Sequence, residues 1–310
     1  MDEAGQAPPR AVIVISSHVA RGTVGNRAAV FALETLGLPV WAVPTVILPW
    51  HPGHGRATRI VPPAGDFAAL LGDLAAAPWL GEVGAVLSGY LGGPDQAAAV
   101  AGLVGAVKAR NPRALYLCDP VMGDVGGLYV PEATAAAMRD LLLPLADIAS
   151  PNRYELEWLA GEALPDNGAV ARAALGLGPP TMLVTSAHAM MAGSIGNLLV
   201  TGREAVLAEH RAVPKAPNGT GDLFSALFLA RLVTGHSEAK ALQAATAAVF
   251  EVLARAVKRG ADELMLETDA QSLAHPMAMV QVRRLVHPAD APSGGPHGGP
   301  AGGPEGGRRA

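Results

Sequence analysis

The sequence has little of what disulfide-linked, nucleic-acid-binding or membrane-spanning proteins need. Its single cysteine, Cys118, excludes an intramolecular disulfide framework and is typical of a reducing compartment. The formal net charge is −4, the pI is about 6.1 and no basic run occurs, so no nucleic-acid partner is expected. Apolar runs of about 18 residues are absent, and the first ten residues do not resemble a signal peptide. We therefore expect a cytoplasmic protein with no membrane partner.

Two common nucleotide-binding patterns are absent as well. The sequence has no G-x-x-x-x-G-K-[ST], which excludes a P-loop protein, and no G-x-G-x-x-G between a strand and a helix. Half of the 310 residues are hydrophobic, which is enough for a sizeable core. Any nucleotide site in this chain must therefore be built in another way.

Short apolar runs alternate with helical patterns along the chain. Strands are predicted at 11–17, 39–43, 114–120, 146–150 and 181–186, with an antiparallel hairpin at 196–213. Helices are predicted at 26–37, 94–108, 154–160, 223–234 and 237–258, and one more opens at Pro131. This alternation predicts an α/β fold with a mostly parallel sheet.

The C-terminal segment differs in composition from the rest. Residues 287–310 contain eight Gly and five Pro, 13 of 24 residues. Such a segment cannot bury enough apolar surface to offset the entropy of ordering it. We expect one domain over residues 1–286 and a disordered tail over 287–310.

Polar residues at predicted strand ends are the first candidates for a site. In a mostly parallel sheet, ligands bind at the carboxyl ends of the strands. The residues at these positions are Ser16, Ser17, His18, Ser88, Gly89, Tyr90, Asp119, Ser150, Pro151, Asn152, Thr185 and Ser186.

The stretch KAPNGTGDLFSAL, residues 215–227, combines two glycines, an acid and a buried helix. Gly219 and Gly221 allow close backbone approach, and the N–H groups of 219–222 then form an anion site at the helix N-terminus. Asp222 is either a helix cap or a general base that takes a proton from an attacking hydroxyl. The almost wholly apolar helix behind it favours the second role.

Two further stretches place carboxylates near a strand end. In CDPVMGD, Asp119 and Asp124 either meet a metal–phosphate complex or simply occupy a turn. In SPNRYELEWL, Ser150 or Asn152 caps a helix, and Glu155 lies in its first turn. Glu155 is either a dipole-matched acid or a partner of Asp119 around hydrated Mg²⁺.

Taken in order and spacing, five stretches resemble pyridoxal kinases of the ribokinase-like superfamily. They are SSHVARGTVGNRAA (16–29), CDPVMGD (118–124), SPNRYELE (150–157), TS (185–186) and GTGDLFSAL (219–227). The resemblance covers about residues 11–282. G-T-G-D is shared across the superfamily, whereas S-H-V-x-x-G-x-x-G-N-x-A is far more specific to pyridoxal kinases. The implied fold is a three-layer α/β/α sandwich with a mostly parallel sheet and an antiparallel edge hairpin.

The resemblance implies ATP-dependent phosphorylation of the 5′-hydroxymethyl group of pyridoxal, pyridoxine or pyridoxamine, with Mg²⁺ and with K⁺ or Na⁺, by a homodimer. Asp222 would be the base, with Gly219, Thr220 and Gly221 as the anion hole. The substrate would contact Ser17, His18, His51 and Tyr90. ATP and Mg²⁺ would lie near Asp119, Asn152, Glu155, Thr185 and Ser186, and a monovalent cation near Asp124 and Ser150.

One segment departs from the family pattern. Many pyridoxal kinases carry SNHTGY after the second strand, whereas this chain has LPWHPGHG at 48–55. His51 matches the histidine of the pattern, but Pro52 replaces its threonine. A proline side chain has no hydrogen-bonding group, so the ring contacts and vitamer preference of this chain are open.

Two other functions remain as alternatives. A hydroxymethylpyrimidine kinase of thiamin synthesis would share G-T-G-D and the acid pair, and only the stretch 16–29 argues against it. A vitamer- or nucleotide-binding regulator without catalysis would have lost the base or the acids, but Asp222, Asp119 and Glu155 are all present.

Overall fold

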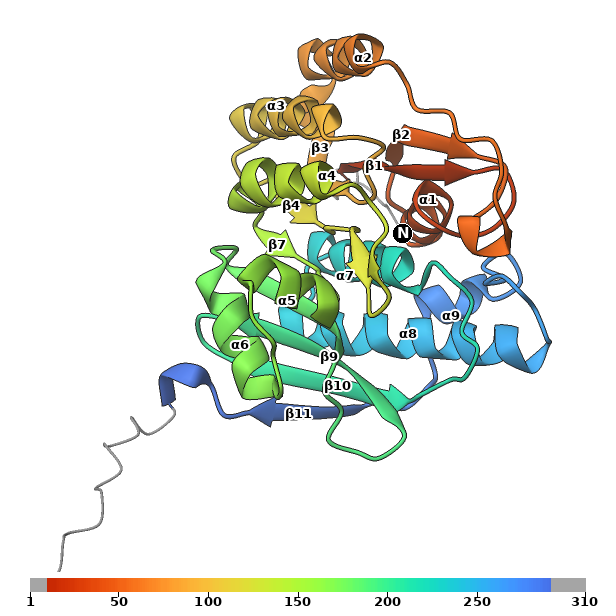
Figure 1. Ribbon diagram of the computed structural model, residues 1–310, viewed down its shortest axis with the longest axis vertical. Coiled ribbons are helices and arrows are strands. Elements are labelled where there is room, and N and C mark those ends of the chain that lie inside the picture. The colour runs from red at the N-terminus through yellow and green to blue at the C-terminus, as the bar shows by residue number, and fades with distance from the viewer. Residues whose placement is uncertain (1–9, 291–310) are drawn as a thin grey trace, which may run out of the picture.

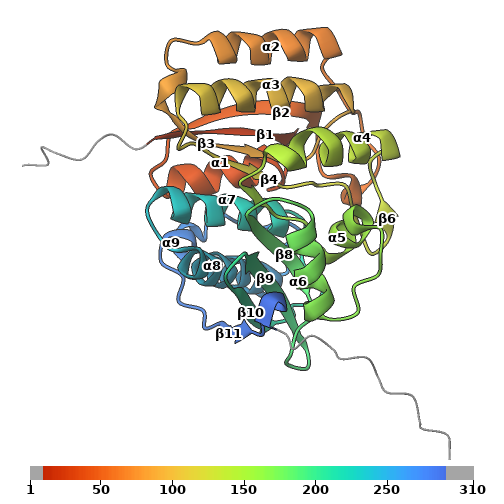
Figure 2. The ribbon, with the colours of Figure 1, turned by 90° about the vertical axis from the view of Figure 1, so that its left-hand side faces the viewer.

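The computed structural model describes residues 10–290 and shows a single nine-stranded sheet with helices on both faces (Figures 1 and 2). The strand order is β11-β10-β9-β8-β7-β4-β3-β1-β2. The strands are β1 (Ala11–Val19), β2 (Val40–Leu48), β3 (Val83–Ser88), β4 (Leu115–Cys118), β7 (Ile148–Ala149), β8 (Thr181–Ala187), β9 (Ser194–Thr201), β10 (Ala205–Arg211) and β11 (Gln281–Leu285). A separate small ribbon pairs β5 (Gly123–Asp124) with β6 (Gly127–Leu128).

The helices form two layers that cover opposite faces of this sheet. Their bounds are α1 (Asn26–Thr35), α2 (Ala64–Ala76), α3 (Asp95–Arg110), α4 (Glu132–Ala137), α5 (Arg153–Ala160), α6 (Asn167–Gly176), α7 (Thr220–Val233), α8 (Glu238–Lys258) and α9 (Ala270–Ala274). One buried cluster takes side chains from α2 to α6, and a second takes them from α1, α7, α8 and α9 (Figure 2). The three-layer α/β/α fold is therefore confirmed.

The strand directions agree with the prediction except at one edge. All pairs from β2 to β8 are parallel, and β9 pairs with β10 as the predicted antiparallel hairpin. The hairpin is not the edge, however, because β11 pairs antiparallel with β10 on its outer side. The sequence of β11, QVRRL, is largely exposed and carries two arginines, as protected edge strands often do, and it lacks the apolar pattern of the other strands.

Helices α2, α6 and α9 were not predicted. Helix α2 contains Gly65 and Gly72, which weaken a helical pattern. Helix α6 begins after a clear signal, because the Asp166 side chain accepts a hydrogen bond from the Ala169 N–H at 2.8 Å. No helix within residues 10–290 is both long enough and apolar enough to span a membrane.

The first four residues assigned to the tail are part of the ordered chain. His287 is buried, and its Nε2 lies 2.9 Å from the Thr201 carbonyl oxygen. Residues Pro288–Asp290 form a short 3-10 turn. The remainder of the predicted tail, residues 291–310, lies outside the described residues, as do residues 1–9.

Candidate active site

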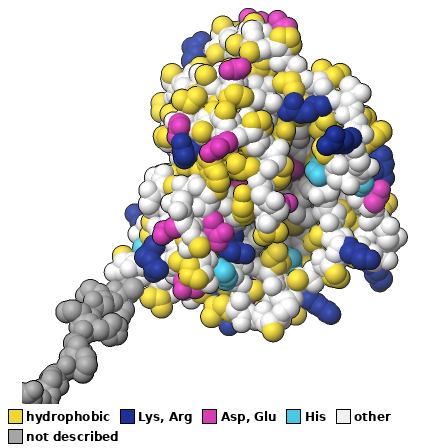
Figure 3. Space-filling view, in the orientation of Figure 1, with side chains coloured by type: hydrophobic (Ala, Val, Ile, Leu, Met, Phe, Trp, Pro, Cys, Tyr) yellow, Lys and Arg dark blue, Asp and Glu magenta, His cyan; other side chains and the backbone are white. Residues whose placement is uncertain are grey.

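A cavity of about 490 Å³ lies where the parallel strands end. Every residue to which the resemblance assigned a role lines it, except His18. Of the strand-end candidates, Ser16, Ser88, Gly89 and Pro151 also do not line it. In the space-filling view, acidic and histidine side chains are visible inside a hollow to the right of the centre (Figure 3). The cavity is also lined by residues that the sequence did not assign to the site: Val24, Leu48, Arg59, Val121, Tyr129 and Asn218.

His18 lies beside the cavity but does not line it. Strand β1 continues to Val19, two residues beyond its predicted end, so Ser17 and His18 are inside the strand. Ser17 lines the cavity and His18, the next residue, does not; the register between β1 and β2 shifts at this point of the strand. Partial burial and the nearby Arg27 lower the pKa of His18. The predicted substrate contact of His18 therefore has no support in this geometry.

Helix α7 begins at Thr220, three residues before its predicted start, and this change settles the position of Asp222. The N-cap is Gly219, and no side chain caps the helix. Asp222 is the third helical residue, and its carboxylate lines the cavity. A helix leaves its first N–H groups without intrahelical acceptors. The helix cap is thus excluded as the role of Asp222, and the carboxylate stands beside a set of free backbone donors.

Two glycines allow the backbones of this site to meet. Gly219 has φ 91°, and a Cβ there would collide with the Thr23 carbonyl oxygen. Gly25 has φ 54°, and a Cβ there would collide with the carbonyl and hydroxyl oxygens of Ser17. Only glycine satisfies both the positive φ and the close approach. The β1–α1 connection and the N-terminus of α7 are therefore held in direct contact.

Asp119 is the centre of a buried hydrogen-bonded chain. The Ser225 hydroxyl donates to Oδ2 of Asp119 at 2.8 Å, and the Ser150 and Ser225 oxygens are 2.6 Å apart. All three residues are buried. Burial first, and then the charges of Glu155 and Asp222, raise the pKa of Asp119 well above its usual range. The hydroxyl of Ser150, which was predicted to lie near a monovalent cation, is thus part of this series of hydrogen bonds.

Glu155 caps the start of helix α5 and also reaches the loop at 118–124. Helix α5 starts with a capping box, in which Asn152 Oδ1 accepts from the Glu155 N–H and Glu155 Oε2 accepts from the Asn152 N–H. Its Oε1 also accepts from the Met122 N–H at 2.9 Å and the Gly123 N–H at 3.3 Å. Glu155 is therefore a capping residue that fixes the 118–124 loop, and it lines the cavity as well.

Burial disfavours the charged forms of the acids in the cavity. Burial raises the pKa of Glu155 to about 7, although three backbone N–H groups act against this rise. Burial also raises the pKa of Asp222 to about 6, opposed by the Gly25 N–H. A cation near Asp119 and Glu155 would favour their ionised forms. Within residues 10–290 no three His, Cys, Asp or Glu side chains group closely enough to hold a metal by themselves. This donor set fits Mg²⁺, which retains water and phosphate ligands.

The remaining predicted residues surround the other side of the cavity. The Thr185 N–H donates to the Pro151 carbonyl at 3.0 Å, which joins the ends of β7 and β8. Ser186 has φ 54°, an uncommon conformation for a non-glycine residue and one that is frequent at ligand sites. Asp124 lies in the β5–β6 ribbon, where its Oδ1 accepts from the Gly126 N–H at 2.7 Å.

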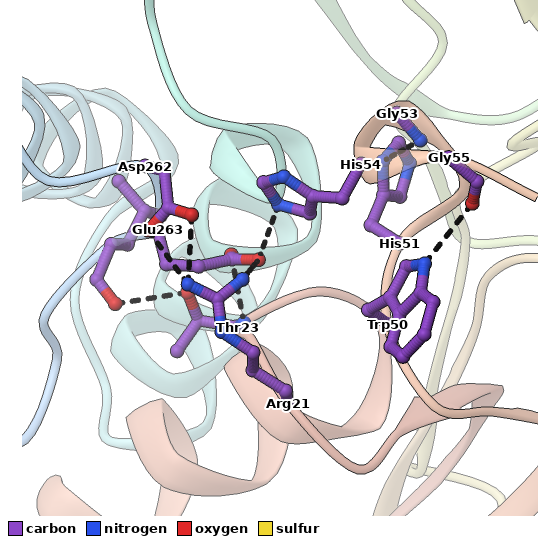
Figure 4. A network of polar contacts seen from close by, with 10 residues as sticks. Arg21, Thr23, Trp50, His51, Gly53, His54, Gly55, Asp262 and Glu263 are labelled. Atoms are coloured by element: carbon purple, nitrogen blue, oxygen red, sulfur yellow. Dashed lines mark hydrogen bonds and ion pairs between the residues drawn. The ribbon is translucent and has the colours of Figure 1, made fainter.

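The loop that carries His51 is tied to the far end of the chain through Glu263 (Figure 4). Nε2 of His54 lies 2.8 Å from Glu263 Oε1, and the Thr23 N–H donates to Glu263 Oε2 at 3.3 Å. Within the loop, the Gly53 N–H donates to Nδ1 of His51 at 3.1 Å. Glu263 therefore joins the loop at 50–55 to the β1–α1 connection, which in turn contacts Gly219.

With this geometry in place, the chain was compared with known proteins. A family model described as phosphomethylpyrimidine kinase matches residues 81–267. The pyridoxal kinase PdxY of Rubrobacter xylanophilus is 42% identical over 88% of this chain and 97% of its own length. The chain belongs to the pyridoxal kinase family. The PdxY of Deinococcus radiodurans is 38% identical over 92% of this chain and 100% of its own length.

Solved members of the pyridoxal kinase family share the fold. The pyridoxal kinase of Leishmania donovani in complex with ADP and pyridoxamine superimposes with a TM-score of 0.84 at 28% identity, covering 89% of this chain and 100% of that one. A putative phosphomethylpyrimidine kinase of Bacteroides thetaiotaomicron, at 21% identity and a TM-score of 0.81, shares the fold alone. The three-layer architecture is thus the ribokinase-like fold of this family.

Replacement of Glu263 by Gln should loosen the loop at 50–55. Losing a charge-assisted hydrogen bond at a buried carboxylate costs about 1–3 kcal/mol, so we expect hydrogen exchange at the Gly53 and His54 amides to become about tenfold faster or more. Mass spectrometry of exchanged peptides measures this. The control is Asp262→Asn, because Asp262 is an exposed partner of Arg21. Unchanged exchange in the Glu263 variant would contradict the structural link.

Proposed function

We propose that this chain transfers the γ-phosphoryl group of ATP to the 5′-hydroxymethyl group of pyridoxal, and to that of pyridoxine or pyridoxamine, in vitamin B6 salvage. The observation that carries the proposal is the Asp222 carboxylate, which caps no helix and lines the cavity beside the free N–H groups of α7. Family membership and the vitamer complex of the Leishmania donovani relative support the choice of substrate.

The cavity has two halves, set by the order of the strands. Ser17, His51 and Tyr90 come from β1, the loop after β2 and the end of β3, which are neighbours at one end of the sheet. Asn152 and Ser186 come from the ends of β7 and β8, further along the sheet. We assign the first half to the vitamer and the second to ATP. The Asp222 carboxylate lies close to the end of β3, which belongs to the vitamer half: a Cβ atom placed on Gly89 would be 3.9 Å from its Oδ1.

In this arrangement the protein contributes positioning and fixed charge. Asp222 accepts the proton of the 5′-hydroxyl as the oxygen attacks phosphorus. The N–H groups of Gly219, Thr220 and Gly221 donate to the transferred phosphoryl oxygens, whose negative charge the helix N-terminus favours. Because these donors belong to a helix packed into the core, they need no rearrangement during the reaction.

We further propose that Mg²⁺ is held near Asp119 and Glu155, with the ATP phosphates and water as its other ligands. When bound, it neutralises phosphate charge. A monovalent cation, K⁺ or Na⁺, is assigned to the neighbourhood of Asp124 and Ser150. Burial of Asp119 and Glu155 supports the Mg²⁺ assignment, because a nearby cation would oppose the rise in pKa that burial causes. A homodimer in the cytoplasm completes the proposal and is tested by the mass of the purified protein in solution.

A substrate panel should show turnover on the vitamers. In a coupled assay of ADP release with ATP and Mg²⁺, we expect pyridoxal and at least one other vitamer to be phosphorylated. Hydroxymethylpyrimidine in place of the vitamer should give a much lower kcat/KM. Turnover on the pyrimidine alone would replace the proposal by a thiamin-precursor kinase. Calorimetric binding of pyridoxal without ATP consumption would indicate a non-catalytic regulator.

Substitution of Asp222 by Asn should abolish turnover without loss of nucleotide binding. The amide keeps the volume of the carboxylate but cannot accept the proton, and general-base catalysis is typically worth 10²- to 10⁴-fold. The measurement is kcat alongside the calorimetric affinity for ADP. As a matched control, Asp95→Asn changes another first-turn acid, on α3, away from the cavity. A wild-type kcat in Asp222→Asn would remove the base from the mechanism.

The rate should fall in acid as the carboxylates of the site become protonated. Asp222 must be ionised to act as a base, and its pKa is raised to about 6, so its active form is lost as the pH falls through that value. We expect kcat at saturating substrates to decrease about tenfold per pH unit below this point. A kcat that stays constant between pH 5 and pH 8 would contradict the assignment.

A further inference from the structure

One cationic side chain lines the cavity, and the mechanism above does not use it. Arg59 is the only Lys or Arg among the described residues that line the cavity. Its Nη2 donates to the Gly92 carbonyl oxygen at 2.8 Å and to the Tyr90 hydroxyl at 3.3 Å. Across residues 10–290, no carboxylate lies within ion-pair distance of its guanidinium. The two neutral acceptors hold the group in place without neutralising its charge.

The position of Arg59 in the fold places its charge in the half of the cavity assigned to the vitamer, called the acceptor half below because the vitamer accepts the phosphoryl group. It belongs to the segment between β2 and α2, and both of its acceptors lie in the turn after β3. Tyr90 in turn is tied to β1, because its N–H donates to the Ser16 hydroxyl at 3.2 Å. The strand ends that carry Asn152 and Ser186 are on the far side of β4. Arg59 thus faces the part of the cavity that we assign to the vitamer.

The guanidinium retains unused donors. An arginine has five N–H donors in a planar fork and no acceptor. Both recorded bonds come from Nη2, so Nη1 and Nε have no acceptor among the described residues. An oxygen anion in the cavity would fit this edge by charge-assisted hydrogen bonds. Pro52, which also lines the cavity, has no side-chain donor that could compete.

We propose that Arg59 selects the acceptor by binding an anionic oxygen on its aromatic ring, which in the vitamers is the oxygen on ring carbon 3. This inference rests on the proposed function. The hydroxyl of a 3-hydroxypyridine ionises readily, and its oxygen accepts hydrogen bonds. A hydroxymethylpyrimidine has a neutral ring nitrogen and no oxygen at the corresponding position, so it cannot form this charge-assisted hydrogen bond. Arg59 is then a specificity-determining residue for pyridine over pyrimidine acceptors.

The decisive experiment compares a vitamer with its 3-deoxy analogue in the wild type and in Arg59→Met. Methionine keeps an unbranched stem and removes the fork. We expect kcat/KM for pyridoxine to fall about 10- to 100-fold, the range for a hydrogen bond to a charged group, while the value for 3-deoxypyridoxine changes less than about threefold. The KM for ATP should not change. Arg56→Met, in the same segment but outside the cavity lining, is the matched control.

Each other outcome has a defined meaning. Equal losses on pyridoxine and its 3-deoxy analogue would overturn recognition of the 3-oxygen. A rise in the KM for ATP with no change for the vitamer would assign Arg59 to a phosphate. Calorimetric titration of both ligands gives the same comparison without turnover, and thermal melts check that the variant folds. If the wild type turned over no vitamer, the proposed function would fail first, whereas normal vitamer turnover with an insensitive Arg59→Met would overturn only this inference.

Discussion

The close contact between the Gly219 and Thr23 backbones is the constraint on which the rest of the site depends. It joins a helix from the last third of the chain to the first connection of the sheet, and no Cβ fits between them. Because of this contact the helix N-terminus meets the end of β1, where Ser17 lies. Glu263 holds the same connection from the opposite side through the Thr23 N–H. Three segments distant in sequence therefore define one geometry for the anion site.

Charge provides the second constraint. Asp119 is almost fully buried and is held by Ser225, while Glu155 accepts three backbone N–H bonds. These bonds stabilise the ionised forms, yet burial outweighs them and raises both pKa values. Holding these two carboxylates in a buried site therefore costs the free energy of desolvating their charge. Their retention at a cavity wall is expected if a cation or a proton transfer uses the charge, which is the pattern of functional carboxylates.

Much of this site could be predicted from local sequence. Parallel strands bring their carboxyl ends together, so Asp119, Asn152 and Thr185 were predicted from strand ends alone. Arg59 could not be found in this way, because it lies in the connection between β2 and α2 rather than at a strand end, and only the fold brings it to Tyr90. His18 shows the converse limit. The motif places His18 next to Ser17 in sequence, but it does not say whether the His18 side chain lines the cavity. The structure shows that β1 continues to Val19, so both residues lie inside the strand.

The division of the cavity explains why family membership determines the chemistry more firmly than the preference among acceptors. The family model spans residues 81–267, which include Asp119, Glu155 and Asp222 but neither Ser17 nor the loop at 48–55. The matched region therefore carries the phosphoryl-transfer apparatus, and most of the acceptor half lies outside it. An acceptor pocket built largely from other segments can change its hydrogen-bonding groups without disturbing the helix that holds the base. Two residues of this pocket illustrate the point: Pro52 has no side-chain hydrogen-bond donor, whereas Arg59 has N–H donors that no described residue accepts.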